Sequence, residues 1–429
     1  MKTINLLIVV LFFSASFAQD DFTTTTAEAT STDTTTSDVP STEEPTTEIS
    51  TTAAPTVQPP TTTAAPGTAE RECGCTHNQI WLDIVAVIDN SQTMTQEGLS
   101  TIQANLDTVI HELTLNISGG WASRVAIVTF NSKAVTVANL TRISNVDDFE
   151  NTIFTQVQLD PVETGVNILS GLQAALDVIK LIKPGPNRRS VVILFTSAYN
   201  NNGYDDPIPM ANSMKSDNIK LITVAFAQRM ESDEVKQVAE LAYPNFNLTN
   251  NQADLIDSIY DRFCQANCFC AGNWLQYRQS YADETSRGFG ICLYYAAISS
   301  AWQPAKFACH GEAKNAYLAS ELSQAKHDFN VAYTRAQAPS NDYDYHIGLS
   351  YNSSNGQYQW EQPVGQGPLP LTGFSAWNLH FPNQQIGNCV RNTRVIGQNY
   401  GWSNEDCWKA AKRYLCQVNT CDTDNYCGN

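Results

Sequence analysis

Two hydrophobic periodicities alternate along the chain between Ile80 and Arg262. Four short runs that are apolar almost throughout predict strands buried on both faces of a sheet: 81–89, 125–130, 190–196 and 219–225. Three longer stretches that repeat apolar residues every three or four positions predict helices: 95–115, 168–182 and 254–263. Because strands and helices alternate, we expect an α/β fold with a doubly wound, mainly parallel sheet and helices on both of its faces.

The pattern changes in the next part of the chain. Residues 268–416 are rich in Trp, Tyr, Asn and Gly, and helical spacing occurs in two places only, 302–308 and 322–336. The rest of this segment predicts short strands and long loops, which is an α+β arrangement. A loop-rich domain of this kind depends on covalent cross-links, and seven cysteines between 268 and 416 can supply them.

The N-terminus has the features of an export signal. Lys2 is followed by the apolar run 4–13 and by small residues at Ser16 and Ala18. This order predicts a cleaved signal peptide over residues 1–18. A retained signal anchor is the alternative, but the apolar run is short for a bilayer span. We therefore expect a secreted, extracellular protein.

A low-complexity segment follows the signal. Of the 46 residues in 23–68, 29 are Thr, Ser or Pro. Such a composition cannot bury enough apolar surface to offset the loss of chain entropy. It predicts a disordered, O-glycosylated stalk over residues 19–72, with an unmodified disordered tail as the alternative.

Charge and motif content exclude several classes of function. The net charge is −18 and there is no basic stripe, so nucleic acids and anionic membranes are unsuitable partners. No run of 18 apolar residues follows the signal, which predicts no membrane insertion. There is no nucleophile elbow, phosphate loop or dinucleotide-binding motif, and His111-Glu112 lacks the second histidine of a zinc protease. We expect a binding protein and not an enzyme.

The first apolar run ends in a motif typical of metal sites. Asp89, Ser91 and Thr93 form D-x-S-x-T. The matching pattern continues in three further segments: Arg124–Phe130, Gly165–Leu172 and Val191–Thr196. Over residues 78–264 the chain resembles a von Willebrand factor A domain. The resemblance implies an adhesion site that holds a divalent cation at the carboxyl ends of the strands.

Two positions depart from that family pattern. The family has a threonine where this chain has Val166, and an aspartate where this chain has Ser197. The resemblance therefore implies an incomplete adhesion site of Asp89, Ser91 and Thr93 with weakened affinity, since the number of charged ligands sets affinity at such sites. We expect no cofactor, with Ca²⁺ or Mg²⁺ as the alternative.

The second domain carries a cysteine and tryptophan pattern. Its landmarks in chain order are Cys270-Ala-Gly-Asn-Trp274, Cys292, Trp302, Cys309, His346-Ile-Gly-Leu349, Cys389, Trp402, Cys407 and Tyr414-Leu-Cys416. Over residues 268–417 the chain resembles a C-type lectin domain, with a cysteine-containing tail at 418–429. The resemblance implies three disulfides: Cys309–Cys416, Cys389–Cys407 and Cys270–Cys292.

Sugar binding in that family normally uses Ca²⁺ held by acids and amides. The corresponding positions here are Phe381-Pro382-Asn383, Gly387, Ser403 and Asn404, so the resemblance leaves only Asn383 of the expected ligands and no carboxylate. Trp377, Phe381 and Asn383 are the candidate residues of the ligand loop. We interpret Phe381 as part of a metal-independent contact, since aromatic side chains stack on sugars or anchor protein contacts.

The even count of twelve cysteines predicts disulfides in an oxidising compartment. Zinc is the alternative for the C-x-C pairs, but no histidine stands at finger spacing from them. Because the ends of an A-type domain lie close together, we expect Cys73 and Cys75 to pair with Cys264 and Cys268. Cys75–Cys264 with Cys73–Cys268 is preferred and the crossed pairing stays open. Two cysteines remain to pair with each other, Cys421 and Cys427.

Four sequons predict N-glycosylation: Asn116, Asn139, Asn247 and Asn352. Together these features resemble the secreted two-domain lectins of nematodes. The resemblance implies recognition of carbohydrate, or of a microbial or extracellular surface ligand, in innate defence. A metal-independent protein-binding or extracellular-matrix module is the alternative. The expected partners are glycans or extracellular proteins.

Overall fold

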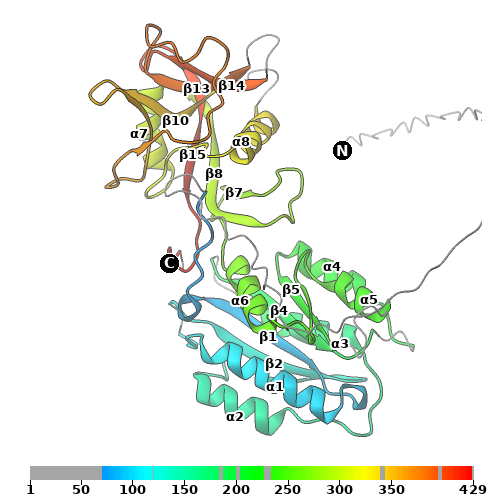
Figure 1. Ribbon diagram of the computed structural model, residues 1–429. Coiled ribbons are helices and arrows are strands. Elements are labelled where there is room, and N and C mark those ends of the chain that lie inside the picture. Colours follow the sequence, from blue (N-terminus) through cyan, green and yellow to red (C-terminus); the bar gives the residue numbers. More distant parts are fainter. Residues whose placement is uncertain are drawn as a thin grey trace, which may run out of the picture. The chain divides into compact units, whose positions relative to one another are not determined.

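The structure is a computed structural model that describes residues 70–118, 120–182, 187–199, 203–226, 233–338, 344–394 and 399–427 (Figure 1). The expected signal peptide, 1–18, and nearly all of the expected stalk, 19–72, lie outside these residues. The part described contains two domains, each built on its own sheet.

Six strands form the sheet of the first domain, in the order β3-β2-β1-β4-β5-β6. They are β1 (Leu82–Asp89), β2 (Arg124–Phe130), β3 (Ala134–Ala138), β4 (Arg189–Thr196), β5 (Lys220–Ala225) and β6 (Asn247–Thr249). Neighbouring strands are parallel except for β2 and β3, which are antiparallel. Every residue of β1 is buried, as the apolar run predicted for a central strand.

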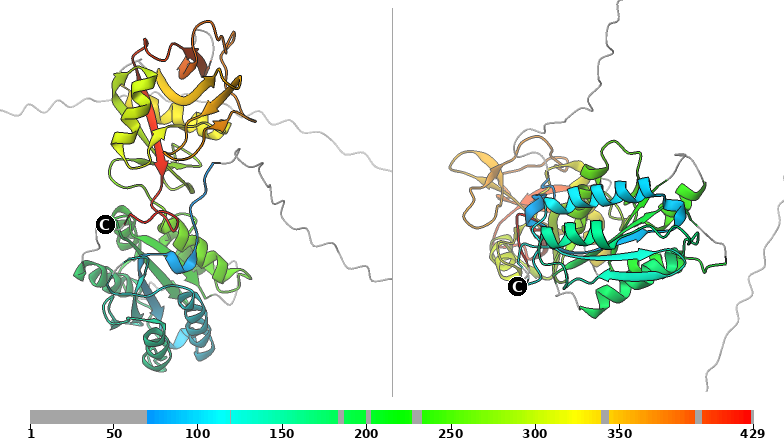
Figure 2. Two further views of the ribbon diagram at one scale, coloured as in Figure 1. Left: turned by 90° about the vertical axis from the view of Figure 1, so that its left-hand side faces the viewer. Right: turned by 90° about the horizontal axis from the view of Figure 1, so that it is seen from below.

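Helices cover both faces of this sheet (Figures 1 and 2). They are α1 (Gln96–His111), α2 (Val146–Gln156), α3 (Ile168–Leu181), α4 (Ile208–Ser216), α5 (Asp233–Leu241) and α6 (Leu255–Ala266), with short 3₁₀ turns η1 (His77–Gln79) and η2 (Gln92–Met94). One hydrophobic core joins the sheet to α1, α2 and α6, and a second joins it to α3, α4 and α5. The predicted doubly wound α/β fold is confirmed.

The end of α1 differs from the periodicity. The apolar spacing predicts a helix to Leu115, but the helix ends at His111. Leu113 and Leu115 remain buried in the same core, and Leu115 forms a bridge with Ser123. The apolar spacing continues past the helix because the next segment packs on the same face, so the pattern reports burial there and not helix.

Nine strands form the sheet of the second domain. They are β7 (Leu275–Arg278), β8 (Gly288–Ser300), β9 (Tyr317–Leu318), β10 (Tyr345–Asn352), β11 (Gln357–Trp360), β12 (Leu369–Pro370), β13 (Cys389–Arg394), β14 (Tyr400–Glu405) and β15 (Lys412–Asn419). Two helices, α7 (Trp302–Glu312) and α8 (Gln324–Gln337), accompany them. This is the predicted α+β arrangement. Strand β15 extends two residues past the expected domain end at 417, because it pairs with β8 as far as Asn419.

Six disulfides cross-link the two domains and the tail. Their pairs are Cys73–Cys268, Cys75–Cys264, Cys270–Cys292, Cys309–Cys416, Cys389–Cys407 and Cys421–Cys427. The three bridges implied by the lectin resemblance are present, and so is the preferred pairing of the four cysteines that flank the first domain. None of the described cysteines has a free thiol, so none is available as a ligand for zinc, which was the alternative.

Two residues at the end of the expected stalk, Glu70 and Arg71, contact residues of the second domain and the tail. Glu70 forms an ion pair with the buried Lys326, 3.4 Å away, and accepts a hydrogen bond from the Leu322 amide at 3.0 Å. Arg71 pairs with Asp422 at 2.6 Å. Composition places these residues with the acidic stalk, but their side chains fill buried, oppositely charged positions on the second domain.

Candidate functional site

The D-x-S-x-T loop follows β1 and has a closed hydrogen-bond network. The Asp89 side chain is fully buried. Its Oδ1 accepts a hydrogen bond from the Ser91 amide at 2.9 Å. Its Oδ2 accepts bonds from the Ser197 amide at 2.9 Å and the Ser197 hydroxyl at 2.6 Å. The parallel pairing of β1 with β4 brings Ser197 to this loop from more than a hundred residues away.

The hydroxyl groups of the motif bond to one another. The Ser91 and Thr93 oxygens lie 2.6 Å apart, and Thr93 Oγ1 lies 2.9 Å from Ser197 Oγ. Val166, at the family's threonine position, is buried in the core with α3. Burial raises the pKa of Asp89, although the hydrogen bonds from Ser197 and Ser91 act in the opposite direction.

These groups are a poor fit for a divalent cation. A hard cation takes six or more oxygen ligands, with carboxylates supplying the charge. The loop offers one carboxylate, and both of its oxygens already accept hydrogen bonds from Ser91 and Ser197. In the described part of the chain, no three His, Cys, Asp or Glu side chains gather as a metal-binding group.

The ligand loop of the second domain lies between β12 and β13 and is held by amide groups. Asn404, on β14, accepts a hydrogen bond from the Asn383 amide at 2.7 Å and donates to the Asn383 carbonyl at 2.6 Å. It also donates to the Gly387 carbonyl. The Asn383 side chain accepts from the Gln385 amide at 3.1 Å. Both asparagines therefore use polar atoms to shape the loop.

Gly387 occupies the position where the lectin family has an acid. Its φ of 157° lies in the region that favours glycine. A Cβ atom added there would lie 2.1 Å from the Glu405 carbonyl oxygen. No side chain fits at Gly387 without a shift of the backbone, so the missing carboxylate cannot be restored by one substitution.

The aromatic candidates divide into framework and surface. The ring of Trp377 packs edge-on against Trp402 and Tyr358, with centroids 5.6 and 4.9 Å apart. Trp377 is partly buried against this core, and its part in a ligand contact stays a prediction. Phe381 is half-buried, and the same loop carries two exposed apolar residues that the sequence analysis missed: Leu379, 65% exposed, and Ile386, 48% exposed. Their place in the ligand loop was the signal available for finding them.

A buried polar cluster lies under this loop and was not predicted. Glu321 is fully buried and accepts hydrogen bonds from Trp402 Nε1 at 2.6 Å and from His327 Nδ1 at 2.7 Å. Three more donors reach its other oxygen: Asn330, Tyr345 and Asn392. Despite burial, the ion pair lowers the pKa of Glu321 and raises that of His327. The cluster fixes Trp402, and through it β14.

The four sequons lie at positions of different exposure. Asn116 and Asn247 are exposed, whereas Asn139 and Asn352 are partly buried. The Asn352 side chain also donates a hydrogen bond to Gln359 at 3.1 Å. Glycosylation at all four stays a prediction. Within the described residues, no helix is both long and apolar enough to cross a membrane.

Two family models match the chain. The von Willebrand factor type A domain matches residues 83–262, and the Lectin C-type domain matches residues 298–418. C-type lectin domain-containing protein 160 of Caenorhabditis elegans is 29% identical over 370 residues, which is 83% of this chain and 56% of that protein. The chain thus spans little more than half the length of this relative.

Two solved structures are similar to single parts of the chain. Proximal thread matrix protein 1 from the mussel byssus, in a structure with a zinc-occupied MIDAS motif, is 19% identical, with a TM-score of 0.38 over 44% of this chain and 48% of that chain. The Ca²⁺-independent C-type lectin SPL-2 from Saxidomus purpuratus is 19% identical, with a TM-score of 0.28 over 35% of this chain and 93% of that chain. With its two family matches and its nematode relative, the chain is a two-domain protein in which a von Willebrand factor type A domain precedes a C-type lectin domain.

Proposed function

We propose that this chain is a secreted recognition protein that binds a carbohydrate, or another microbial or extracellular surface ligand, in innate defence. The two domains indicate recognition or adhesion through carbohydrate or protein binding. We further propose that it acts by binding and not by catalysis, and that binding needs no divalent cation.

The arrangement of Asn404 carries the metal-independent part of the proposal. The side-chain amide of Asn404 forms hydrogen bonds with three backbone groups of the ligand loop. These bonds order the loop, which is the role that a metal ion would otherwise have. Because the protein's own amide groups hold the loop, its shape does not depend on Ca²⁺. The half-buried Phe381 and its exposed neighbours Leu379 and Ile386 then offer an apolar contact surface.

A glycan array probed with and without a chelator tests this proposal. We expect binding that is unchanged by the chelator and is reduced roughly five- to thirtyfold in Phe381→Ala, since a well-packed aromatic contact contributes on the order of 1–2 kcal/mol. Phe307→Ala is the matched control, because Phe307 is 59% exposed on α7 and lies outside the loop.

Loss of binding with the chelator would refute the metal-independent contact. Equal binding by Phe381→Ala and wild type would remove the loop from the site. Silence on a broad array would favour the alternative, a protein-binding or matrix module, for which the exposed apolar pair Leu379 and Ile386 is equally suitable.

A further inference from the structure

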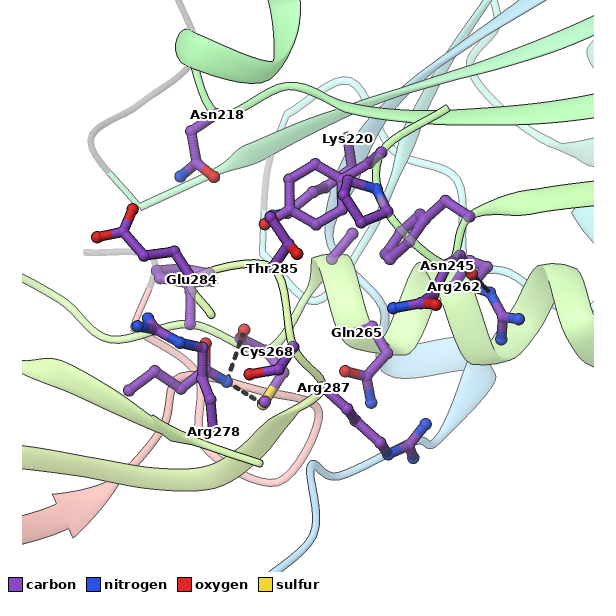
Figure 3. Close-up of a pocket in the computed structure, with 18 of the residues that line it drawn as sticks. Asn218, Lys220, Asn245, Arg262, Gln265, Cys268, Arg278, Glu284, Thr285 and Arg287 are labelled. Carbon is purple, nitrogen blue, oxygen red and sulfur yellow. Dashed lines mark hydrogen bonds between the residues drawn. The ribbon is translucent and has the colours of Figure 1, made fainter. Parts of the chain in front are cut away.

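A pocket of about 930 Å³ lies away from both loops described above. Its walls include Arg189 at the start of β4, Lys220 at the start of β5 and Arg278 at the end of β7. Figure 3 shows the labelled side chains of Lys220, Arg278 and Glu284 around this space. A volume of this size falls within the range of small-molecule sites, roughly 300–1,000 Å³.

Some of the cations in this pocket are neutralised by acids. Asp261 forms ion pairs with Arg262 and with Arg287, the latter at 3.2 Å. The other lining acids lie at the edge: Asp283 accepts bonds from the Thr285 amide and hydroxyl at 2.9 and 2.6 Å. These contacts account for Arg262 and Arg287 but not for the remaining cations.

Three lining cations form no direct ion pair or hydrogen bond with an acid among the described residues, although the charge of Asp283 interacts with that of Arg278. The guanidinium of Arg189 stacks on Phe269, 4.3 Å from the ring centre, and Lys220 Nζ lies 3.3 Å from the ring centre of Tyr243. The buried Nε atoms of Arg189 and Arg278 have no hydrogen-bond partner in the described structure. We call Arg189, Lys220 and Arg278 the cation triad.

The charges of the triad act on one another. Burial lowers the pKa of Lys220 to about 7, and repulsion from Arg189 and Arg278 contributes to the same shift. Burial also lowers the pKa of Arg189. The three side chains are partly exposed, and like charges held close together in a partly desolvated site are unfavourable, so an anion that enters the pocket relieves this repulsion.

We propose that the cation triad binds a small ligand that carries sulfate or phosphate groups. Arginine N–H groups and a lysine ammonium form short, charge-assisted hydrogen bonds to such oxyanions. The pocket is larger than a single ion, which favours an oxyanion attached to a further group such as a sugar. This site is independent of the ligand loop and so goes beyond the function proposed above.

Calorimetric titration of the full chain tests the site with four probes: inorganic sulfate, inorganic phosphate, a sulfated disaccharide and an uncharged disaccharide. We expect both inorganic ions to bind, the sulfated disaccharide to bind more tightly, and the uncharged one not to bind. Arg278→Gln and Lys220→Met should each weaken binding about tenfold. Glu284→Gln should strengthen it, because it removes a negative charge from the pocket edge.

Lys236→Gln is the matched control, since it removes one positive charge from an exposed lysine on α5 outside the pocket. Its affinity should equal that of wild type. Because the triad variants break no direct ion pair, they should fold, and an unchanged melting profile checks this. Binding of inorganic ions alone would support the site and assign it to a free ion.

The pH dependence gives a second readout. The charged and titratable groups around Lys220 are Arg189, Arg278 and Tyr243. Two acids, Asp283 and Glu284, lie at the edge of the pocket. Because only protonated lysine attracts an anion, the affinity should rise as pH falls through about 7, and this rise should be absent in Lys220→Met. No binding of any oxyanion, or equal affinity in Arg278→Gln and wild type, would overturn the proposal.

Discussion

Replacing Glu321 by glutamine removes one charge and one acceptor oxygen from the centre of the lectin domain while preserving its shape. Glu321 accepts hydrogen bonds at both oxygens: Trp402 and His327 at Oε2, and a group of three donors at Oε1, Asn330, Tyr345 and Asn392. A glutamine has one acceptor oxygen and one NH₂ group. In either orientation its NH₂ group faces at least one group that can only donate, which is Trp402 Nε1 on one side and the Asn330 and Asn392 amides on the other, and that donor loses its acceptor.

The size of the effect follows from these contacts. A buried donor left without a partner costs about 1–3 kcal/mol, and breaking one member of a buried ion pair costs about 3–5 kcal/mol. Because the donors share one acceptor, the losses overlap, and we expect a destabilisation of about 3–5 kcal/mol in total. The equilibrium constant for local opening of β14 should therefore be larger in the variant than in the wild type by a factor on the order of a hundred or more.

Amide hydrogen exchange of the full chain, measured on the peptides of β13 and β14, detects this opening. Exchange there should accelerate by about that factor in Glu321→Gln, while β1 and β4 in the first domain keep their protection. Glu312→Gln is the matched control, because Glu312 is exposed at the end of α7. If Glu321→Gln and Glu312→Gln gave equal exchange in β14, the carboxylate would not hold Trp402 in the way we describe.

Two further predictions concern pH and metal binding. The pKa of His327 is raised from 6.5, so His327 stabilises the lectin domain fully below pH 6.5 and loses this effect as the pH rises through the pKa in the folded state. The pKa of Glu321 is lowered from 4.5, so Glu321 stabilises the domain above pH 4.5 and loses this effect as the pH falls through the pKa in the folded state. Melting of that domain should therefore peak between these values, and a flat profile in the wild type would contradict the ion pair. In the A-type domain, Val166→Thr with Ser197→Asp should create Mg²⁺ binding that calorimetry detects, and Val166→Thr alone should not, because the second carboxylate supplies the missing charge beside Asp89. Equal heats for the double variant and wild type would refute this account of the loop.

Much of the architecture could be predicted from local patterns. The apolar runs that became β1 and β4 are buried on both faces, and this is a property that a parallel sheet imposes on each strand separately. The residues that depart from the family patterns, such as Val166 and Gly387, were also visible in the sequence. The structure adds the physical content: Val166 belongs to the core, and Gly387 has no room for a side chain.

Only the tertiary structure decided which distant groups meet. The pairing of Cys73 with Cys268 was one of two open alternatives, and the docking of Glu70 on Lys326 contradicts the composition of its segment. The cation triad combines positions 189, 220 and 278, and no spacing rule connects them. Hydrophobic periodicity reports how each segment is buried, whereas strand order and register determine which side chains share a pocket. The sequence by itself therefore determined the two fold classes and the presence of disulfides, and the tertiary structure decided between the open cysteine pairings and placed the charged pocket and the exposed apolar residues.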